Sequence, residues 1–184
     1  MEGITLAESV GEHRVTSLLK PNLAVAQARL GRYDEALQTA LENLEQVGPA
    51  SLLYSRFEAL RCLAEVRFHR ALAAVSASGS DSQSKSVESI RGSELDEAER
   101  LCAEAAELVA PTESRVSRLW LGPLYIEVLL TQCKRAKAEN DNAAAERKFS
   151  EAAKMLATYQ ELVADCQSPR FTAAASRLAA IFER

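Results

Sequence analysis

Apolar residues recur at intervals of three and four along most of the chain, the spacing that places them on one face of an α-helix. The first such segment, HRVTSLLKPNLAVAQARL, is followed by Gly31, and the second, DEALQTALENLEQV, by Gly48 and Pro49. Glycine readily adopts the left-handed conformation that ends many helices. The pattern therefore predicts two helices joined by a short turn. Pro21 predicts that the first helix either starts near Lys20 or is kinked there.

The same succession of a long helix and a partner helix occurs twice more. One pair is predicted from a helix over about 51–75 and a second helix that starts with Ser93 as its N-cap. The other pair has a first helix disturbed at Gly122-Pro123 and a turn at Asn140-Asp141. Ser168-Pro169 is typical of a helix start and predicts a closing helix. No segment alternates in the way that a β-strand would.

Residues 76–93 interrupt the second pair with eight serines in eighteen residues and few apolar side chains. Such a composition cannot offset the entropy lost on ordering, so a flexible insertion is predicted between the two helices. A second interpretation is a phosphorylated regulatory loop, because Ser78 and Ser93 are each followed three residues later by an aspartate. A phosphate on Ser93 would favour the helix start expected there.

Composition narrows the class of protein. A chain of 184 residues is long enough for one domain, predicted over 1–184. The net charge of −4 argues against broad nucleic-acid or anionic-membrane binding, and no apolar run reaches the roughly 18 residues of a spanning helix. The four cysteines, none in a CxxC pair, are expected to be buried thiols in a reducing compartment, the cytoplasm or nucleus. No metal or cofactor is expected.

The stretch NLAVAQARLGRYDEALQTALENLEQVGP resembles a tetratricopeptide repeat, a helix-turn-helix unit of about 34 residues. The resemblance is carried by the Leu30-Gly31 turn, the aromatic Tyr33, the Asp34-Glu35 pair and the small Ala36. Weaker copies place matching residues at Leu95, Asp96, Glu97, Ala98, Cys102 and Ala105, and at Asn140, Ala145, Phe149 and Ala152. Asn43, at a place usually given to alanine, is a departure.

The resemblance implies an all-α, right-handed superhelical stack of antiparallel helix hairpins, about three pairs plus a C-terminal capping helix. In such stacks the first helix of each pair lines a concave groove that binds a peptide or a partner helix. The groove candidates are Asn22, Val25, Arg29, Arg61, Glu65, Phe68, His69, Leu130, Lys134 and Lys137. Pro21 and Val25 stand where members that grip chaperone C-termini have a lysine and an asparagine, so a chaperone adaptor is not expected.

Two bulky apolar groups are candidates for core packing or, where exposed, for a contact with a partner or a second copy. One group surrounds Gly122-Pro123 and includes Trp120 and Tyr125. The other lies on one face of the closing helix and comprises Leu178, Ile181 and Phe182.

The expected function is therefore non-catalytic: a scaffold or adaptor that binds a peptide or helix of a partner protein in its groove. The alternative is a structural or regulatory segment of a larger signalling or ATPase protein, which mediates interdomain packing or self-association. An enzyme is not expected, because no Ser/His/Asp or Cys/His spacing involves His13 or His69, and no Gly-rich phosphate loop is present.

Overall fold

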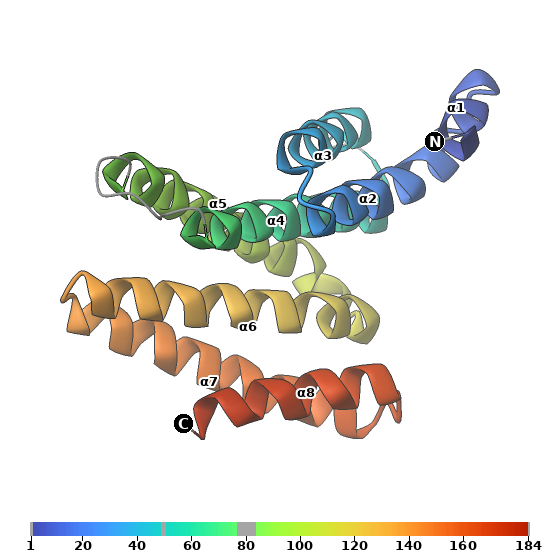
Figure 1. Ribbon diagram of the computed structural model, residues 1–184. Helices are drawn as coiled ribbons and strands as arrows, with labels where there is room; N and C mark the ends of the chain where they lie inside the picture. Colours follow the sequence, from blue (N-terminus) through green and yellow to red (C-terminus); the bar gives the residue numbers. More distant parts are fainter. Residues whose placement is uncertain (1, 49–50, 77–83, 184) are drawn as a thin grey trace. The chain divides into compact units, whose positions relative to one another are not determined.

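The computed structural model describes residues 2–48, 51–76 and 84–183, and within these ranges it is all-α, as predicted, with no strand. Figure 1 shows the helices in chain order. Their bounds are α1 (Glu2–Ser9), α2 (His13–Arg29), α3 (Tyr33–Val47), α4 (Leu53–Ser76), α5 (Ser84–Val109), the short 3-10 helix η1 (Ala110–Thr112), α6 (Arg115–Ala138), α7 (Asn142–Ala164) and α8 (Pro169–Phe182).

The chain divides into two compact units, Met1–Leu108 and Val109–Arg184. The N-terminal unit contains α1 to α5, and the C-terminal unit contains η1 and α6 to α8. The helices of each unit pack against their neighbours in the chain. α1 contacts α2 and was not predicted from the sequence.

The predicted turn at Gly31 joins α2 to α3. Gly31 has a φ of 79°, in the left-handed region that glycine adopts without strain, so α2 ends there as expected. α3 begins at Tyr33, and Asp34 lies in its first turn. There the negative charge of Asp34 interacts favourably with the positive end of the helix dipole. α2 does not begin near Lys20: it starts at His13 and continues through Pro21.

The core of the N-terminal unit is formed where α2, α3 and α4 all contact one another. α3 turns one face of mostly small residues inward, namely Ala36, Ala40, Asn43 and Val47. Small side chains let helix backbones approach closely, which explains why alanine recurs at these positions. From α4, large side chains such as Phe57 and Leu60 are fully buried.

α5 begins at Ser84, so the predicted helix start at Ser93 is wrong, and 84–93 belongs to a helix instead of a flexible insertion. Ser78 lies outside the described residues. α5 is joined to α4 by Glu94, whose carboxylate accepts hydrogen bonds from Arg67 of α4 at 2.9 Å and from Arg70 of α4 at 3.1 Å. A carboxylate held between two guanidinium groups favours this pairing of helices.

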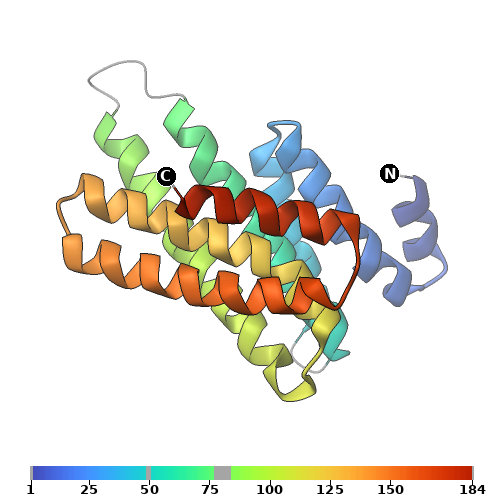
Figure 2. The same ribbon diagram turned by 90° about the horizontal axis from the view of Figure 1, so that it is seen from below.

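In the C-terminal unit, α6 and α7 lie side by side, and α8 contacts both of them (Figures 1 and 2). Asn140 has a φ of 62°, and the side chain of Asp141 accepts a hydrogen bond from the backbone N–H of Ala144 at 2.9 Å. These features make the predicted turn and cap α7. α8 starts at Pro169, after Ser168, as expected.

Candidate partner-binding surface

α2 and α4 contact each other in the N-terminal unit and carry seven of the ten predicted groove residues. Four of the seven meet in one charged cluster. Arg29 on α2 donates a hydrogen bond from Nη2 to Oε1 of Glu65 on α4, at 2.9 Å. Arg61, one turn earlier on α4, donates to Oε2 of the same carboxylate, also at 2.9 Å. The Nε2 atom of His69 lies 3.8 Å from Oε1.

The spacing along α4 explains how this cluster forms. Arg61, Glu65 and His69 follow each other at intervals of four residues, which places them on one face of the helix. Glu58, three residues before Arg61, accepts two further hydrogen bonds from that guanidinium. The side chains of Arg61 and Glu65 are only 12% and 13% exposed, whereas Arg29 is 62% exposed. The α4 side chains of the cluster are therefore half-buried, whereas the cation on α2, Arg29, faces solvent.

The electrostatics of the cluster are dominated by Glu65. Burial by itself would raise the pKa of this carboxyl, but the neighbouring His69, Arg61 and Arg29 lower it to about 2. For Arg61, burial opposes the charged form, yet the adjacent carboxylates of Glu58 and Glu65 raise its pKa. Glu65 and Arg61 are consequently both charged at neutral pH, and the Glu65 carboxylate connects α4 to α2 through its salt bridge with Arg29.

The remaining predicted residues of these two helices differ in accessibility. Asn22 is exposed and donates a hydrogen bond to the carbonyl of Leu18 one turn earlier. Val25 is half-buried. Phe68 is buried, with 4% of its surface exposed, so it belongs to the core and offers no surface to a partner.

The other three groove candidates lie on α6, in the C-terminal unit. Leu130 is buried, whereas Lys134 and Lys137 are exposed. Because a leucine at 7% exposure cannot receive a ligand side chain, Leu130 is a core residue.

Two apolar residues of α2 were not among the site predictions. Val15 and Leu18 are 43% and 42% exposed. Together with Asn22, Val25 and Arg29 they recur at alternating intervals of three and four, which places all five on one helix face. The apolar spacing placed Val15 and Leu18 on one helix face, but it is the spacing of a buried face and gave no sign of their exposure. We name this face, with the charged cluster of α4, the α2–α4 surface.

The residues predicted for an interface mostly pack within the C-terminal unit. Trp120 is half-buried, and its ring meets Phe171 of α8 edge-on with centroids 5.6 Å apart. The guanidinium carbon of Arg170 lies 4.1 Å from the centroid of Trp120. Tyr125 and Leu178 are buried. Ile181 stays 37% exposed, and Phe182 packs against the exposed Phe149 at 5.1 Å.

The cysteines differ from one another. Cys62, Cys102 and Cys133 are buried and Cys166 is exposed, so the expectation of four buried thiols is wrong for the last one, which lies in the turn after α7. Burial raises the pKa of Cys62 to about 12. Within the described residues, no three His, Cys, Asp or Glu side chains gather in a way that could hold a metal ion.

None of the described helices combines the length and the apolar character needed to cross a membrane. No protein-family model matches the sequence, and the comparison with curated proteins likewise returned no match.

Proposed function

We propose that the chain is a non-catalytic protein-recognition module of the tetratricopeptide type, a right-handed stack of helix hairpins that holds a peptide or helix of a partner on the α2–α4 surface. The observation that carries the proposal is the salt bridge between Arg29 and Glu65, which joins α2 to α4. In the proposed stack these two helices are the first helices of successive hairpins. Such first helices are the ones that line the groove in stacked helical repeats.

The chemistry of the α2–α4 surface suits a partner segment with both apolar and polar side chains. Val15 and Leu18 offer apolar contact at one end of α2, Asn22 lies between, and Arg29 offers a cation at the other end. Arg29 has most of its side chain in solvent even though Glu65 binds it. Arginine is one of the residue types enriched among those that dominate the binding energy of interfaces.

The test starts with a pull-down from a cell lysate, in which mass spectrometry identifies the captured proteins. A captured protein is then purified, and its binding to two charge-reversal variants is compared. Arg29→Glu changes the α2–α4 surface. Arg32→Glu is the matched control, because Arg32 is also an exposed arginine in an ion pair, 54% exposed, and lies at the start of α3. Binding of a purified partner is expected to be lost with Arg29→Glu and kept with Arg32→Glu.

Equal binding by the two variants would reject the α2–α4 surface as the binding site. Arg29→Glu also places a carboxylate next to Glu65, so folding must be checked by circular dichroism. The swap Arg29→Glu with Glu65→Arg restores the salt bridge in reverse. If the swap folds like the wild type and still fails to bind, the loss reflects a missing surface cation and not a distorted helix pair.

A second candidate function is packing or self-association within a larger assembly. The observation that favours it is the aromatic pair of Phe149 and Phe182 with Ile181 beside it, of which Phe149 is 42% exposed. A double substitution Phe149→Ser and Ile181→Ser tests it by sedimentation. A concentration-dependent change in mass that disappears in this variant would support self-association.

A further inference from the structure

Two side chains of the α2–α4 surface lie beside one carboxylate oxygen. The Oε1 atom of Glu65 accepts the hydrogen bond from Arg29 at 2.9 Å, and the Nε2 atom of His69 lies 3.8 Å from the same oxygen. The other oxygen, Oε2, is bonded to Arg61. A separation of 3.8 Å is too long for a hydrogen bond, so Arg29 and not His69 holds Oε1 in this arrangement.

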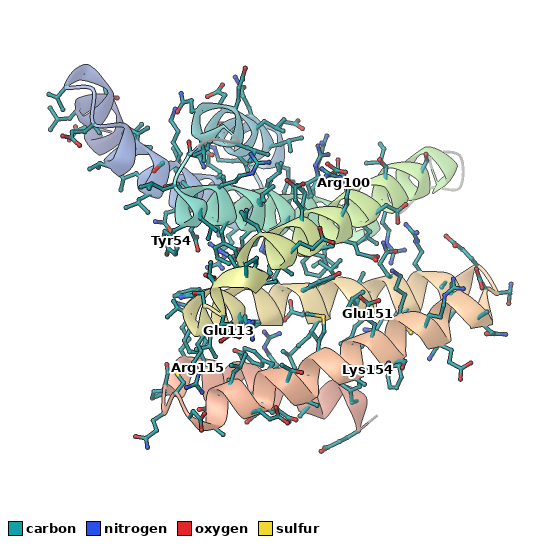
Figure 3. All side chains as sticks on the ribbon, turned by 180° about the vertical axis from the view of Figure 1, so that it is seen from behind. Tyr54, Arg100, Glu113, Arg115, Glu151 and Lys154 are labelled. Carbon is teal, nitrogen blue, oxygen red and sulfur yellow. The ribbon has the colours of Figure 1, made fainter. Side chains whose placement is uncertain are left out.

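His69 is the member of this cluster whose type of side chain changes its charge near neutral pH. An unperturbed imidazole titrates at about pH 6.5, whereas guanidinium groups stay charged throughout the physiological range. An ion pair made by arginine, such as that of Arg100 with Glu97 on α5, therefore keeps its charges between pH 5 and 8 (Figure 3). The histidine makes the charge around Glu65 dependent on pH.

The surroundings of His69 leave Glu65 as its partner. Among the described residues, Glu65 is the carboxylate within ion-pair distance of the His69 ring. The helices α3 and α5 contribute acidic side chains to the neighbouring part of α4, Asp34 and Glu94, but both of these carboxylates are bound by Arg70. The charged group that α2 contributes is the guanidinium already described. A protonated His69 would therefore pair with Glu65.

Protonation places a positive charge on the imidazole and makes both ring nitrogens donors. A hydrogen bond from an imidazolium to a carboxylate is charge-assisted, and its favoured length is well below 3.8 Å. His69 and Glu65 lie one turn apart on the same helix, so a rotation of their side chains brings them together without a movement of the backbone. The Oε1 atom of Glu65 would then have two cations beside it, which repel each other.

Arg29 is the cation that this repulsion displaces. Its side chain is 62% exposed, so water replaces the lost hydrogen bond and the side chain regains rotamer freedom. Arg61 stays in place, because it is only 12% exposed and also donates to Glu58. The result is a guanidinium on α2 that no longer shares its charge with Glu65.

The net charge of the cluster changes in the same direction. With a neutral imidazole, the charges of its two arginines and two glutamates cancel, and protonation of the histidine makes the total +1. A surface of positive charge favours a partner of negative charge. A carboxylate suits a guanidinium best, because the two groups are planar and can form two parallel hydrogen bonds.

We propose that protonation of His69 releases Arg29 from Glu65, and that the released guanidinium binds a carboxylate in an acidic segment of the partner. The second step rests on the partner-binding function proposed above, whereas the first concerns this chain alone. The α2–α4 surface would thus bind its partner more tightly at pH 5.5 than at pH 7.5.

The first test measures the coupling of Arg29 to Glu65 without any ligand. The full chain, Arg29→Gln, Glu65→Gln and the double variant are unfolded in urea at pH 7.5 and at pH 5.5. At pH 7.5, Arg29→Gln is expected to lower the folding equilibrium constant about two- to fivefold more in the wild-type background than in the Glu65→Gln background. This ratio should approach one at pH 5.5. The same ratio at both pH values would overturn the release of Arg29.

Two histidine variants assign the pH dependence to one residue. In the His69→Gln background, the coupling ratio is expected to be as large at pH 5.5 as at pH 7.5, because no imidazolium forms beside Glu65. His13→Gln is the matched control, since His13 is the other histidine of the sequence, and it should leave the pH dependence intact. A pH dependence that persists in His69→Gln, or disappears in His13→Gln, would overturn the role of His69.

The second test uses a tetra-aspartate peptide as a carboxylate probe, which stays ionised at both pH values. NMR signals of the arginine side chains report its binding. The signal of Arg29 is expected to shift with an affinity at least about threefold higher at pH 5.5, a factor within the range of an exposed salt bridge. The signal of Arg32, which pairs with Glu35, is the control and should show no such dependence. An equal affinity at Arg29, or no shift at pH 5.5, would overturn the binding of a carboxylate.

These tests separate the inference from the function on which its second step rests. Neither uses a partner protein, so a negative result leaves the binding function to the comparison of Arg29→Glu with Arg32→Glu. Rejection of the α2–α4 surface in that comparison would overturn the acidic partner segment and would leave the release of Arg29 standing on the unfolding data.

Discussion

The ring of Tyr159 on α7 lies directly against the backbone of Gly122 on α6. A Cβ atom built on Gly122 would be 2.7 Å from Cδ2 of Tyr159, closer than carbon atoms approach in proteins. Tyr159 is 2% exposed and Gly122 is buried, so neither has free space to move into. The absence of a side chain at one residue is what lets these two helices meet at this point.

Gly122→Ala is therefore expected to destabilise the protein by about 1–3 kcal/mol through overpacking, despite the better helix propensity of alanine. Denaturant unfolding followed by circular dichroism measures the change. Gly3→Ala in α1 is the control, because a Cβ there would meet only Leu19 at 3.7 Å, an ordinary contact. An equal effect of the two substitutions would contradict the role assigned to the Gly122–Tyr159 contact.

Asn43 on α3 is 1% exposed, and neither its amide nitrogen nor its amide oxygen has a hydrogen-bond partner among the described residues. A buried polar group without partners costs about 1–3 kcal/mol. Asn43→Ala removes this cost and improves helix propensity, but it also removes a few packing contacts. The net effect is expected to be a stabilisation of the protein by about 1 kcal/mol. Thermal unfolding measures it, and a lower melting temperature for the variant would show that Asn43 is bonded in solution.

The charged cluster predicts a dependence of stability on pH. Because the pKa of Glu65 is lowered from 4.5 to about 2, its ionised form is favoured by the fold. Its contribution is complete above pH 4.5 and is lost as the pH falls through 2. The free energy of unfolding should decrease by about 1–3 kcal/mol over that window on account of this residue.

Unfolding at a series of pH values, compared with Glu65→Gln, tests this prediction. The variant is expected to be less stable at pH 7, and the difference from wild type should shrink toward pH 2. Glu35→Gln is the control, since Glu35 is exposed and its described ion pair is with Arg32, three residues away. A constant difference between wild type and Glu65→Gln from pH 7 to pH 2 would show that Glu65 does not titrate as described.

Thiol reactivity should divide the cysteines into two groups. Cys166 is exposed and is expected to react at once with a disulfide reagent at pH 8. The Cys62 thiol is buried and donates a hydrogen bond to the carbonyl of Pro21 at 3.3 Å, and burial raises its pKa to about 12, so little thiolate forms. Cys102 and Cys133 are buried as well. One thiol should therefore react in the native protein and four after unfolding, and more than one fast thiol would indicate an open core.

Much of the fold could be predicted from neighbouring residues alone. The turns at Gly31 and at Asn140-Asp141 were predicted correctly, because a left-handed backbone and an aspartate cap depend on residues within one helical turn. The closing helix after Ser168 followed from the same local chemistry. The helix start placed at Ser93 was wrong although its capping chemistry is sound, since the helix extends to Ser84.

The candidate site was predicted only in part. Arg29, Arg61, Glu65 and His69 lie on α2 and α4 and meet in one cluster, whereas their role in binding a partner stays a prediction. Phe68 and Leu130 were predicted to line the groove but are buried. The side of a helix that faces the core depends on which helices surround it. Val15 and Leu18 follow the spacing of a buried face and are nonetheless exposed.

By itself, the sequence determined the helical class, the places where the chain turns and the faces on which residues gather, because each depends on backbone preferences and spacing within a few residues. Only the tertiary structure decided which partners meet across the chain. Arg29 and Glu65 are 36 residues apart, and the contact of Gly122 with Tyr159 joins two different helices. Such pairs depend on how helices pack, a property of side-chain shape and burial that no local pattern records.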